Sequence, residues 1–109
     1  MALKANIIID QGSTFQTTVN VTDENDDIVD LTNYSAAAQM RKHYTSSNAY
    51  NFTTSISPAL GTVTLSMNAN TTNTLEPGRY LYDCELTDNN GAVTRLVEGV
   101  VTVTPGITR

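Results

Sequence analysis

Two side chains of this 109-residue sequence are candidates for nucleophilic or acid–base chemistry, His43 and Cys84. An imidazole can act as a general base and a thiolate as a nucleophile, but each needs a partner within hydrogen-bond reach. His43 follows Arg41 and Lys42, as is typical of a solvated strand end, and no hydrolase motif such as G-x-S-x-G is present. Cys84 falls on the inward side of a predicted strand, where a thiol is inert. We therefore predict no catalytic residue, no cofactor and no enzymatic activity.

Metal binding has one candidate motif. Asp23, Asn25 and Asp27 form the pattern D-x-N-x-D that opens a calcium-binding loop. The sixth position of such a loop is Ile28 here, where glycine is needed, and the twelfth is Tyr34, where a bidentate glutamate belongs. A polar turn explains the motif better, with weak cation binding as the alternative. One Cys and one His also do not make a usual zinc site, so we predict no metal site.

One pair of aromatic residues is a candidate for contact with a ligand at the surface. Tyr44 and Tyr50 flank a loop rich in Ser and Asn, and exposed aromatic rings over a polar groove are what a carbohydrate-adhesion site requires. Asp83 and Glu85 lie two residues apart on the outward face of a predicted strand. Such a carboxylate pair is typical of a solubilising surface.

Charge and hydropathy exclude two classes of partner. The formal net charge is −5, and no basic run is longer than Arg41 and Lys42, whereas a protein that neutralises phosphates needs a basic patch. The longest apolar run is Ile7, Ile8 and Ile9, too short to span a membrane, and the first ten residues lack the apolar core of a signal peptide. A single cysteine suits a reducing cytosol. We expect neither nucleic acid nor membrane as a partner.

The elements that position these residues are predicted to be strands. Eighteen Thr, with many Val, Ile and Tyr, favour a pleated surface, and eleven Asn supply turns. Apolar and polar residues alternate over residues 15–22, 34–41, 52–56, 63–67 and 80–86. Further strands are predicted at 3–9 and 92–104, with a short run at 28–31. No helix of ten or more residues separates them, so parallel βαβ units are excluded. An antiparallel sandwich or a small barrel remains.

Local signals refine this prediction. Asp88-Asn89-Asn90-Gly91 predicts a hairpin, and Gly99 is expected to mark a bulge in the returning strand. Thr71 or Thr72 is predicted to cap a single helical turn that brings Leu75 to the core.

The segment LEPGRYLYDC at residues 75–84 resembles the corner that leads into strand F of immunoglobulin-like domains. By this resemblance Tyr82, two residues before Cys84, would donate a hydrogen bond back across the corner. We predict an all-β fold, an antiparallel Ig-like β-sandwich of about seven strands that forms a single domain over residues 1–109. Without Trp or a second Cys it is not an antibody-type domain.

The sequence also resembles small virion structural proteins of tailed bacteriophages. It is similar to the Ig-like domains at the start of phage baseplate upper proteins and to structural proteins of cyanophages. The resemblance implies a non-enzymatic component of the tail, baseplate or neck, assembled in the host cytoplasm and held in the virion by other virion proteins and copies of itself. The runs that carry it are QGSTF at 11–15, DLTNYSA at 30–36, QMR at 39–41, GTVTLS at 61–66, LEPGRYLYD at 75–83, GAVTRLVEG at 91–99 and the terminal Thr108 and Arg109.

Assembly through sheet edges is the predicted mechanism, because an edge strand presents unpaired backbone groups to a neighbour. The first strand, residues 4–9, and the last, residues 100–104, are the expected edges, with the tail after Pro105 as a further contact. The alternative is that both ends complete the domain's own sheets. The alternative function is carbohydrate adhesion through Tyr44 and Tyr50, or head decoration. The candidate interface residues are Lys4, Ile7, Ile9, Val101, Val103, Ile107 and Arg109.

Overall fold

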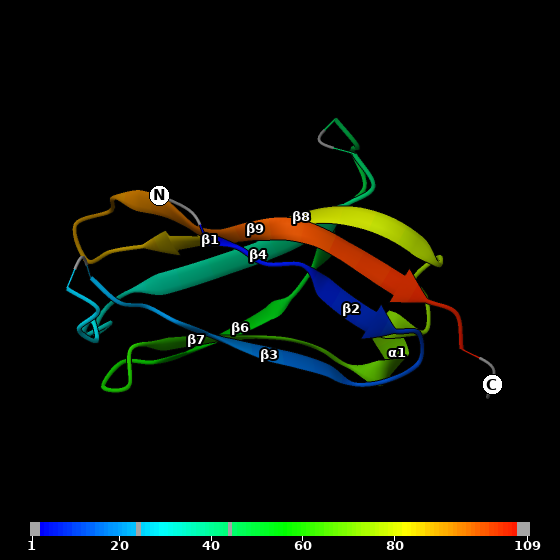
Figure 1. The fold of residues 1–109 in the computed structure, drawn as a ribbon. Coiled ribbons are helices and arrows are strands. Elements are labelled where there is room, and N and C mark those ends of the chain that lie inside the picture. The colour runs from blue at the N-terminus through cyan, green and yellow to red at the C-terminus, as the bar shows by residue number, and fades with distance from the viewer. Residues whose placement is uncertain (1–2, 24, 44, 107–109) are drawn as a thin grey trace.

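Strands make up most of the chain in the computed structural model, which describes residues 3–23, 25–43 and 45–106 (Figure 1). They lie in two layers, and the all-β class is confirmed. Among the described residues, no helix has the length and apolar character needed to cross a membrane. The elements are β1 (Leu3–Lys4), β2 (Ile7–Asp10), β3 (Phe15–Asn20), β4 (Ser35–Arg41), β5 (Tyr50–Asn51), β6 (Thr53–Ser57), β7 (Thr62–Met67), α1 (Ala69–Thr72), β8 (Gly78–Thr87) and β9 (Val93–Thr104).

The larger sheet has the strand order β1–β9–β8–β4–β5, with β2 also paired to β9, and the smaller sheet has the order β3–β7–β6. All neighbouring pairs are antiparallel except that β1 and β2 run parallel to β9. The prediction of a purely antiparallel arrangement is therefore wrong at the N-terminus. No hairpin joins the first strand to the last, so no turn imposes an antiparallel direction on that pair.

The last strand is not an edge, contrary to the prediction. β9 pairs with β8 on one side and with β1 and β2 on the other. The alternative, that both ends complete the domain's own sheet, is confirmed. Pairing on both sides satisfies the backbone groups of β9, and among the described residues only the first strand keeps a free side in this part of the sheet.

The core lies between the sheets and follows the alternation of the strands. Every second residue of β7 is buried, and so is every second residue of β8 from Tyr80 onward. Because successive side chains point to opposite faces of a strand, this pattern gives each sheet one apolar inner face. Most of the core comes from Ile9, Met40, Val63, Leu65, Met67, Tyr80, Tyr82, Cys84, Leu86, Val97, Val101 and Val103.

One extended segment contributes to both sheets at Phe52. β5 pairs with β4 in the larger sheet, and β6 pairs with β7 in the smaller one. Phe52 between them is buried, and its backbone N–H donates to the carbonyl of Ala38 at 3.0 Å. Its ring lies 6.0 Å from Phe15 and 6.2 Å from Tyr82 between ring centroids, so the change of sheet is anchored by aromatic packing.

The corner before β8 is made by Tyr80 rather than by Tyr82, the residue that the Ig-like resemblance indicated. The Tyr80 hydroxyl donates to the carbonyl oxygen of Glu76 at 2.7 Å. Tyr82 lies two residues further along β8, too far away to reach the corner. Its hydroxyl donates to the carbonyl oxygen of Ala5 at 2.6 Å. The first inward tyrosine after the Pro77-Gly78 turn is the one close enough to reach back.

Gly99 is not at a bulge. It pairs in regular register with Tyr82, and the register shifts where Cys84 pairs with Val97 but Glu85 pairs with Arg95. The extra residue is Leu96, so the bulge lies three residues earlier than predicted.

The other local predictions hold in part. The hairpin forms over 88–92, with Gly91 at φ +87° and its N–H donating to the Asp88 carbonyl, so the loop is longer than a two-residue turn. The helical turn forms and Leu75 is buried, but Asn68 caps it by accepting from the Thr71 N–H at 2.8 Å. The run at 28–31 makes only an isolated bridge, between Thr22 and Ile28.

Candidate interaction surface

Four of the predicted interface residues are buried between the sheets. Ile7 and Ile9 on β2 point inward, and so do Val101 and Val103 on β9, which pair with them in register. They belong to the core, so their side chains cannot contact a partner in this state. The run Ile7, Ile8 and Ile9 is apolar throughout, and alternation therefore gave no sign of which residues face inward.

The free side of the first strand does present exposed groups. Lys4 on β1 is exposed, as predicted for an edge residue. Ile8 on β2, which the sequence analysis did not select, is 68% exposed. The predicted contacts Ile107 and Arg109 lie outside the described residues. A free strand edge with an exposed apolar side chain is a surface that a neighbouring protein can extend or cover.

Between β1 and β2 the strand departs from a regular ladder. Ala5 donates its N–H to the carbonyl of Glu98 at 3.0 Å, as a parallel pair requires. The next ladder bond would join the Val100 N–H to the Ala5 carbonyl. Instead the Val100 N–H donates to Oδ1 of Asn6 at 3.1 Å, and the Ala5 carbonyl accepts from the Tyr82 hydroxyl. The side chain of Asn6 thus satisfies the Val100 N–H and that of Tyr82 satisfies the Ala5 carbonyl, in place of one backbone hydrogen bond between the two.

This exchange needs a glycine at position 99. A Cβ on Gly99 would overlap the carbonyl oxygen of Ala5 and lie 2.9 Å from its carbonyl carbon. The missing side chain therefore leaves the space through which the Tyr82 hydroxyl reaches the first strand. The edge strand is fastened to the sheet at this point by a buried phenol as well as by its ladder.

Replacing Tyr82 by phenylalanine is expected to lower the free energy of unfolding by about 1 to 2 kcal/mol, because the Ala5 carbonyl loses its donor. Chemical denaturation measures this directly. Tyr34→Phe is the matched control, since the Tyr34 hydroxyl has no hydrogen-bond partner in the described part of the chain, and it should stay within about 0.5 kcal/mol of wild type. Equal stability of Y82F and wild type would show that the bond carries no stability.

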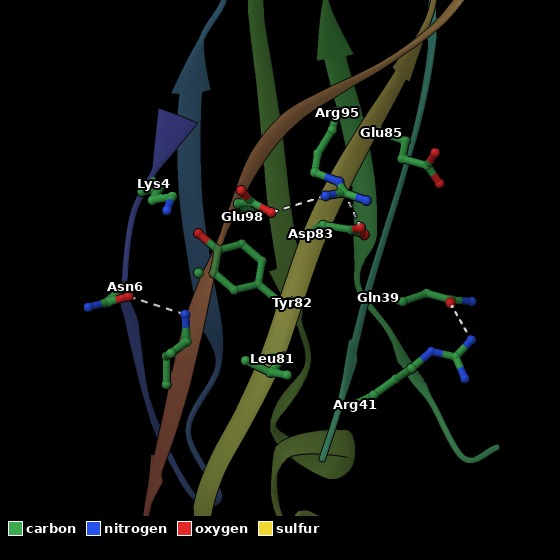
Figure 2. Close-up of a pocket in the computed structure, with 12 residues that line it drawn as sticks. Lys4, Asn6, Gln39, Arg41, Leu81, Tyr82, Asp83, Glu85, Arg95 and Glu98 are labelled. Atoms are coloured by element: carbon green, nitrogen blue, oxygen red, sulfur yellow. Dashed lines mark hydrogen bonds and ion pairs between the residues drawn. The ribbon is translucent and has the colours of Figure 1, made fainter. Parts of the chain in front are cut away.

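The surface of the larger sheet that faces away from the core is called the outer face here. On β8 it consists of Arg79, Leu81, Asp83 and Glu85, which alternate with the buried residues of that strand. A hollow of about 500 Å³ opens on it, and Figure 2 shows the side chains that line it. Leu81 pairs directly with Val100 on β9, and both are half-buried. The hollow therefore has an apolar centre.

Charged groups surround that centre. Arg95 on β9 lies between two carboxylates, with Nε 3.4 Å from Oδ2 of Asp83 and Nη1 3.2 Å from Oε2 of Glu98 (Figure 2). Exposed pairs of this kind contribute little to stability. Within the described residues, Arg79 and Glu85 form no ion pair. On β8 the outer face thus keeps Arg79 and Glu85, both exposed, near the two ends of the strand. Lys4 and Arg41, which also line the hollow, form no ion pair within the described residues either.

No protein-family model matches this sequence, and no curated protein does either.

A second hollow, of about 310 Å³, contains one of the two predicted adhesion residues. Tyr50 lines it with Lys42, Glu76 and the loop at 46–48. Tyr50 is half-buried and packs edge-on against Tyr80, with ring centroids 6.0 Å apart, and Nζ of Lys42 lies 4.8 Å above the Tyr80 ring. The other candidate, Tyr44, lies outside the described residues. The hollow combines an aromatic ring with polar groups, and it shares no lining residue with the outer-face hollow.

Cys84 and His43, the two candidates for chemistry, lie in different surroundings. Cys84 is fully buried, and burial, followed by the charges of Asp83 and Glu85, raises the pKa of its thiol to about 11. The thiol is therefore protonated at neutral pH. His43 is exposed, two residues beyond the end of β4.

The Asp23 carboxylate holds residues 25–27 in a turn. One oxygen of Asp23 accepts the N–H groups of Asn25 at 2.8 Å and Asp27 at 3.1 Å. This geometry is that of an Asx turn and supports the polar-turn interpretation of the motif. Within the described residues, no cluster of three or more His, Cys, Asp or Glu side chains is placed to hold a metal ion.

Proposed function

We propose that this chain is a non-enzymatic structural protein of a tailed-bacteriophage virion, acting in the tail, baseplate or neck through its sheet edge and surfaces. The observation that carries the proposal is the free edge of β1 and β2 with exposed Ile8, beside an outer face that has an apolar centre and a charged rim. Such a surface suits contact with other proteins. The resemblance to phage virion proteins supports the proposal that these contacts are made in a virion.

The strand connections support an Ig-like β-sandwich as the architecture of this single domain. β1 and β2 keep one register against β9, so they count as one interrupted strand. β5 and β6 likewise form one extended segment broken at Phe52. Counted in this way, the chain has about seven strands in two facing sheets, with the first strand beside the last. This count agrees with the seven strands of the smaller Ig-like sandwiches.

Assembly would use the backbone of the first strand and the surfaces beside it. β2 is hydrogen-bonded to β9 on one side, and its other side is available to a strand from a neighbour. The partners are then other virion proteins and further copies of this chain, met after synthesis in the host cytoplasm. No reacting group takes part in this function.

The decisive experiment locates the chain in purified particles. Mass spectrometry of particles separated on a density gradient should recover the chain with the known structural proteins, and an antibody against it should label one fixed position in electron micrographs. Labelling at the tail, baseplate or neck supports the proposal, and labelling over the capsid identifies the head-decoration alternative. Recovery only from the soluble lysate would show that the chain is no virion component.

Carbohydrate adhesion is the second candidate, and the hollow beside Tyr50 favours it. An aromatic ring, the Lys42 ammonium and loop hydroxyls converge there, as sugar recognition requires. Binding of the purified protein on a glycan array, lost in Tyr50→Ala and kept in the control Tyr34→Ala, would support adhesion. A blank array at high protein concentration would remove this candidate and leave assembly.

A further inference from the structure

The first strand has unused backbone groups on its open side. Within the described residues, no strand pairs with β1 or β2 on the side away from β9 (Figure 1). The Ala5 N–H donates to Glu98 and the Gln11 N–H donates to Thr104, both on β9. Because successive residues of a strand direct their N–H groups to opposite sides, the even-numbered residues of this segment direct theirs to the open side. They are Lys4, Asn6, Ile8 and Asp10.

The side chains of the same four residues are exposed. Lys4 lines the outer-face hollow, and Ile8 is 68% exposed. Oδ1 of Asp10 accepts a hydrogen bond from the Thr104 hydroxyl at 2.7 Å, on the outer face. In the part of the chain that the structure describes, neither Lys4 nor Asp10 forms an ion pair. The edge thus carries one unpaired positive and one unpaired negative charge, placed symmetrically about Ile7.

We propose that the first strand pairs antiparallel with the first strand of a second copy, across a two-fold axis that passes between the two copies of Ile7. The axis is perpendicular to the sheet, so the outer faces of both copies lie on the same side. Lys4 of each copy then lies opposite Asp10 of the other, and Asn6 lies opposite Ile8. The larger sheets of the two copies become one continuous sheet.

The directions of the backbone groups allow this register. It places even-numbered residues opposite even-numbered residues, so the open-side groups of the two strands point at each other. Asn6 and Ile8 then form a pair that exchanges two backbone hydrogen bonds, and the two-fold axis repeats this pair. The Asp10 N–H donates to the Lys4 carbonyl, whereas the Asp10 carbonyl already accepts from the Ser13 N–H at 3.0 Å. An offset of one residue would place open-side groups opposite residues that are bonded to β9.

Charge selects this register among those that the backbone allows. An offset of two residues, which sets Ile8 opposite Ile8 or Asn6 opposite Asn6, separates Lys4 from Asp10 of the other copy. Opposite charges directly across an antiparallel pair are stabilising, and like charges are destabilising. Charged side chains on an edge strand commonly prevent pairing. Here their symmetry about Ile7 makes pairing with a second copy bring unlike charges together.

Apolar contact adds to the pairing. In this register the two Ile8 side chains are diagonal neighbours, about 7 to 8 Å apart, a distance that long side chains bridge. Their contact removes from water the most exposed apolar side chain of the first strand. This inference deepens the proposed assembly function and rests on it for its setting in the virion.

Sedimentation equilibrium of the full chain over a range of concentrations tests the proposal. Wild type should show a monomer–dimer equilibrium. Lys4→Glu and Asp10→Lys should each raise the dissociation constant at least about tenfold, because each places like charges opposite each other twice. The double variant K4E/D10K should restore the affinity of the wild type. Thr104→Val is the matched control, since it removes the hydroxyl bond to Asp10 without a change of charge, and it should dimerise like wild type.

Two further measurements test the backbone pairing itself. Ile8→Pro removes an N–H that only the second copy uses, and proline is tolerated on an edge strand. It should raise the dissociation constant at least about tenfold, and more than Ile8→Ala, which keeps the N–H. In wild type, amide hydrogen exchange at Asn6 and Ile8 should slow as the protein concentration rises, because dimerisation gives these N–H groups partners.

The outcomes separate this proposal from the proposed function. A wild-type chain that stays monomeric at all concentrations overturns the edge-to-edge dimer, and so does a dimer that K4E and D10K leave unchanged. Failure of K4E/D10K to restore affinity, with circular dichroism and melting like wild type, also overturns it. If I8P does not fold, the charge variants and the amide exchange decide. Each of these results leaves the location of the chain in particles to be decided independently.

Discussion

Replacing Gly99 by alanine is expected to lower the free energy of unfolding by about 3 kcal/mol or more. The new methyl group would overlap the Ala5 carbonyl oxygen, which is backbone and cannot rotate away. The first strand must then move off β9, and its carbonyl loses the Tyr82 hydroxyl. Urea denaturation followed by circular dichroism measures the change.

Gly91→Ala is the matched control for this substitution. A Cβ on Gly91 meets no atom within 4 Å, but its φ of +87° makes alanine strained, so a cost of about 1 kcal/mol is expected. The loss at Gly99 should clearly exceed this value. Faster amide hydrogen exchange in residues 3–10 of G99A would show that the first strand is the part released. A G99A protein as stable as wild type would contradict the close approach of Ala5 to β9.

The protein is expected to lose about 5 kcal/mol of stability between pH 9 and pH 12. Burial, followed by the neighbouring Cys84, raises the pKa of Tyr82 to about 12, and the pKa of Cys84 is raised to about 11. Both groups are buried in their neutral forms, so the unfolded chain releases its protons first. When folding raises the pKa of a group, its contribution to stability is complete below the pKa that the group has in the unfolded chain. This contribution is lost as the pH rises through the pKa that the group has in the folded protein. Each unit of pKa difference between the folded and unfolded protein corresponds to about 1.4 kcal/mol of stability.

Urea titrations at a series of pH values check the alkaline loss. Stability should be level from pH 7 to about 8.5 and should then fall. Cys84→Ala removes one of the two groups, so the fall in this variant should be smaller by about 2 kcal/mol at pH 11, whatever its stability at neutral pH. Parallel curves for C84A and wild type would contradict the assignment of the first part of the loss to the thiol.

Much of the fold could be predicted from alternation and turn residues. The inward positions of Tyr80, Tyr82, Cys84 and Leu86 follow from a period of two along one strand, and the structure buries all four. The hairpin before β9 and the burial of Leu75 after a helical turn were predicted from local residue types. Such features depend on neighbours within a few residues, and the sequence displays those neighbours directly.

The interaction surface could be predicted only in part. Lys4 was correctly placed at an exposed edge, but alternation cannot orient the uniformly apolar run that contains Ile8. The role of Gly99 depends on Ala5, which is distant in sequence and was not expected to run parallel to β9. Asp83 and Glu85 were interpreted as solubilising charges, because nothing in the sequence shows that Arg95 pairs with one and leaves the other free.

By itself, the sequence determined that the chain is built from strands with one apolar face each, because a period of two and the turn residues between strands are local properties. Only the tertiary structure decided that the first strand lies parallel to the last, that Tyr82 fastens it, and that Arg95 pairs with Asp83 and Glu98 on the outer face. These features depend on contacts between residues up to 94 positions apart, and their geometry is set by how the strands pair.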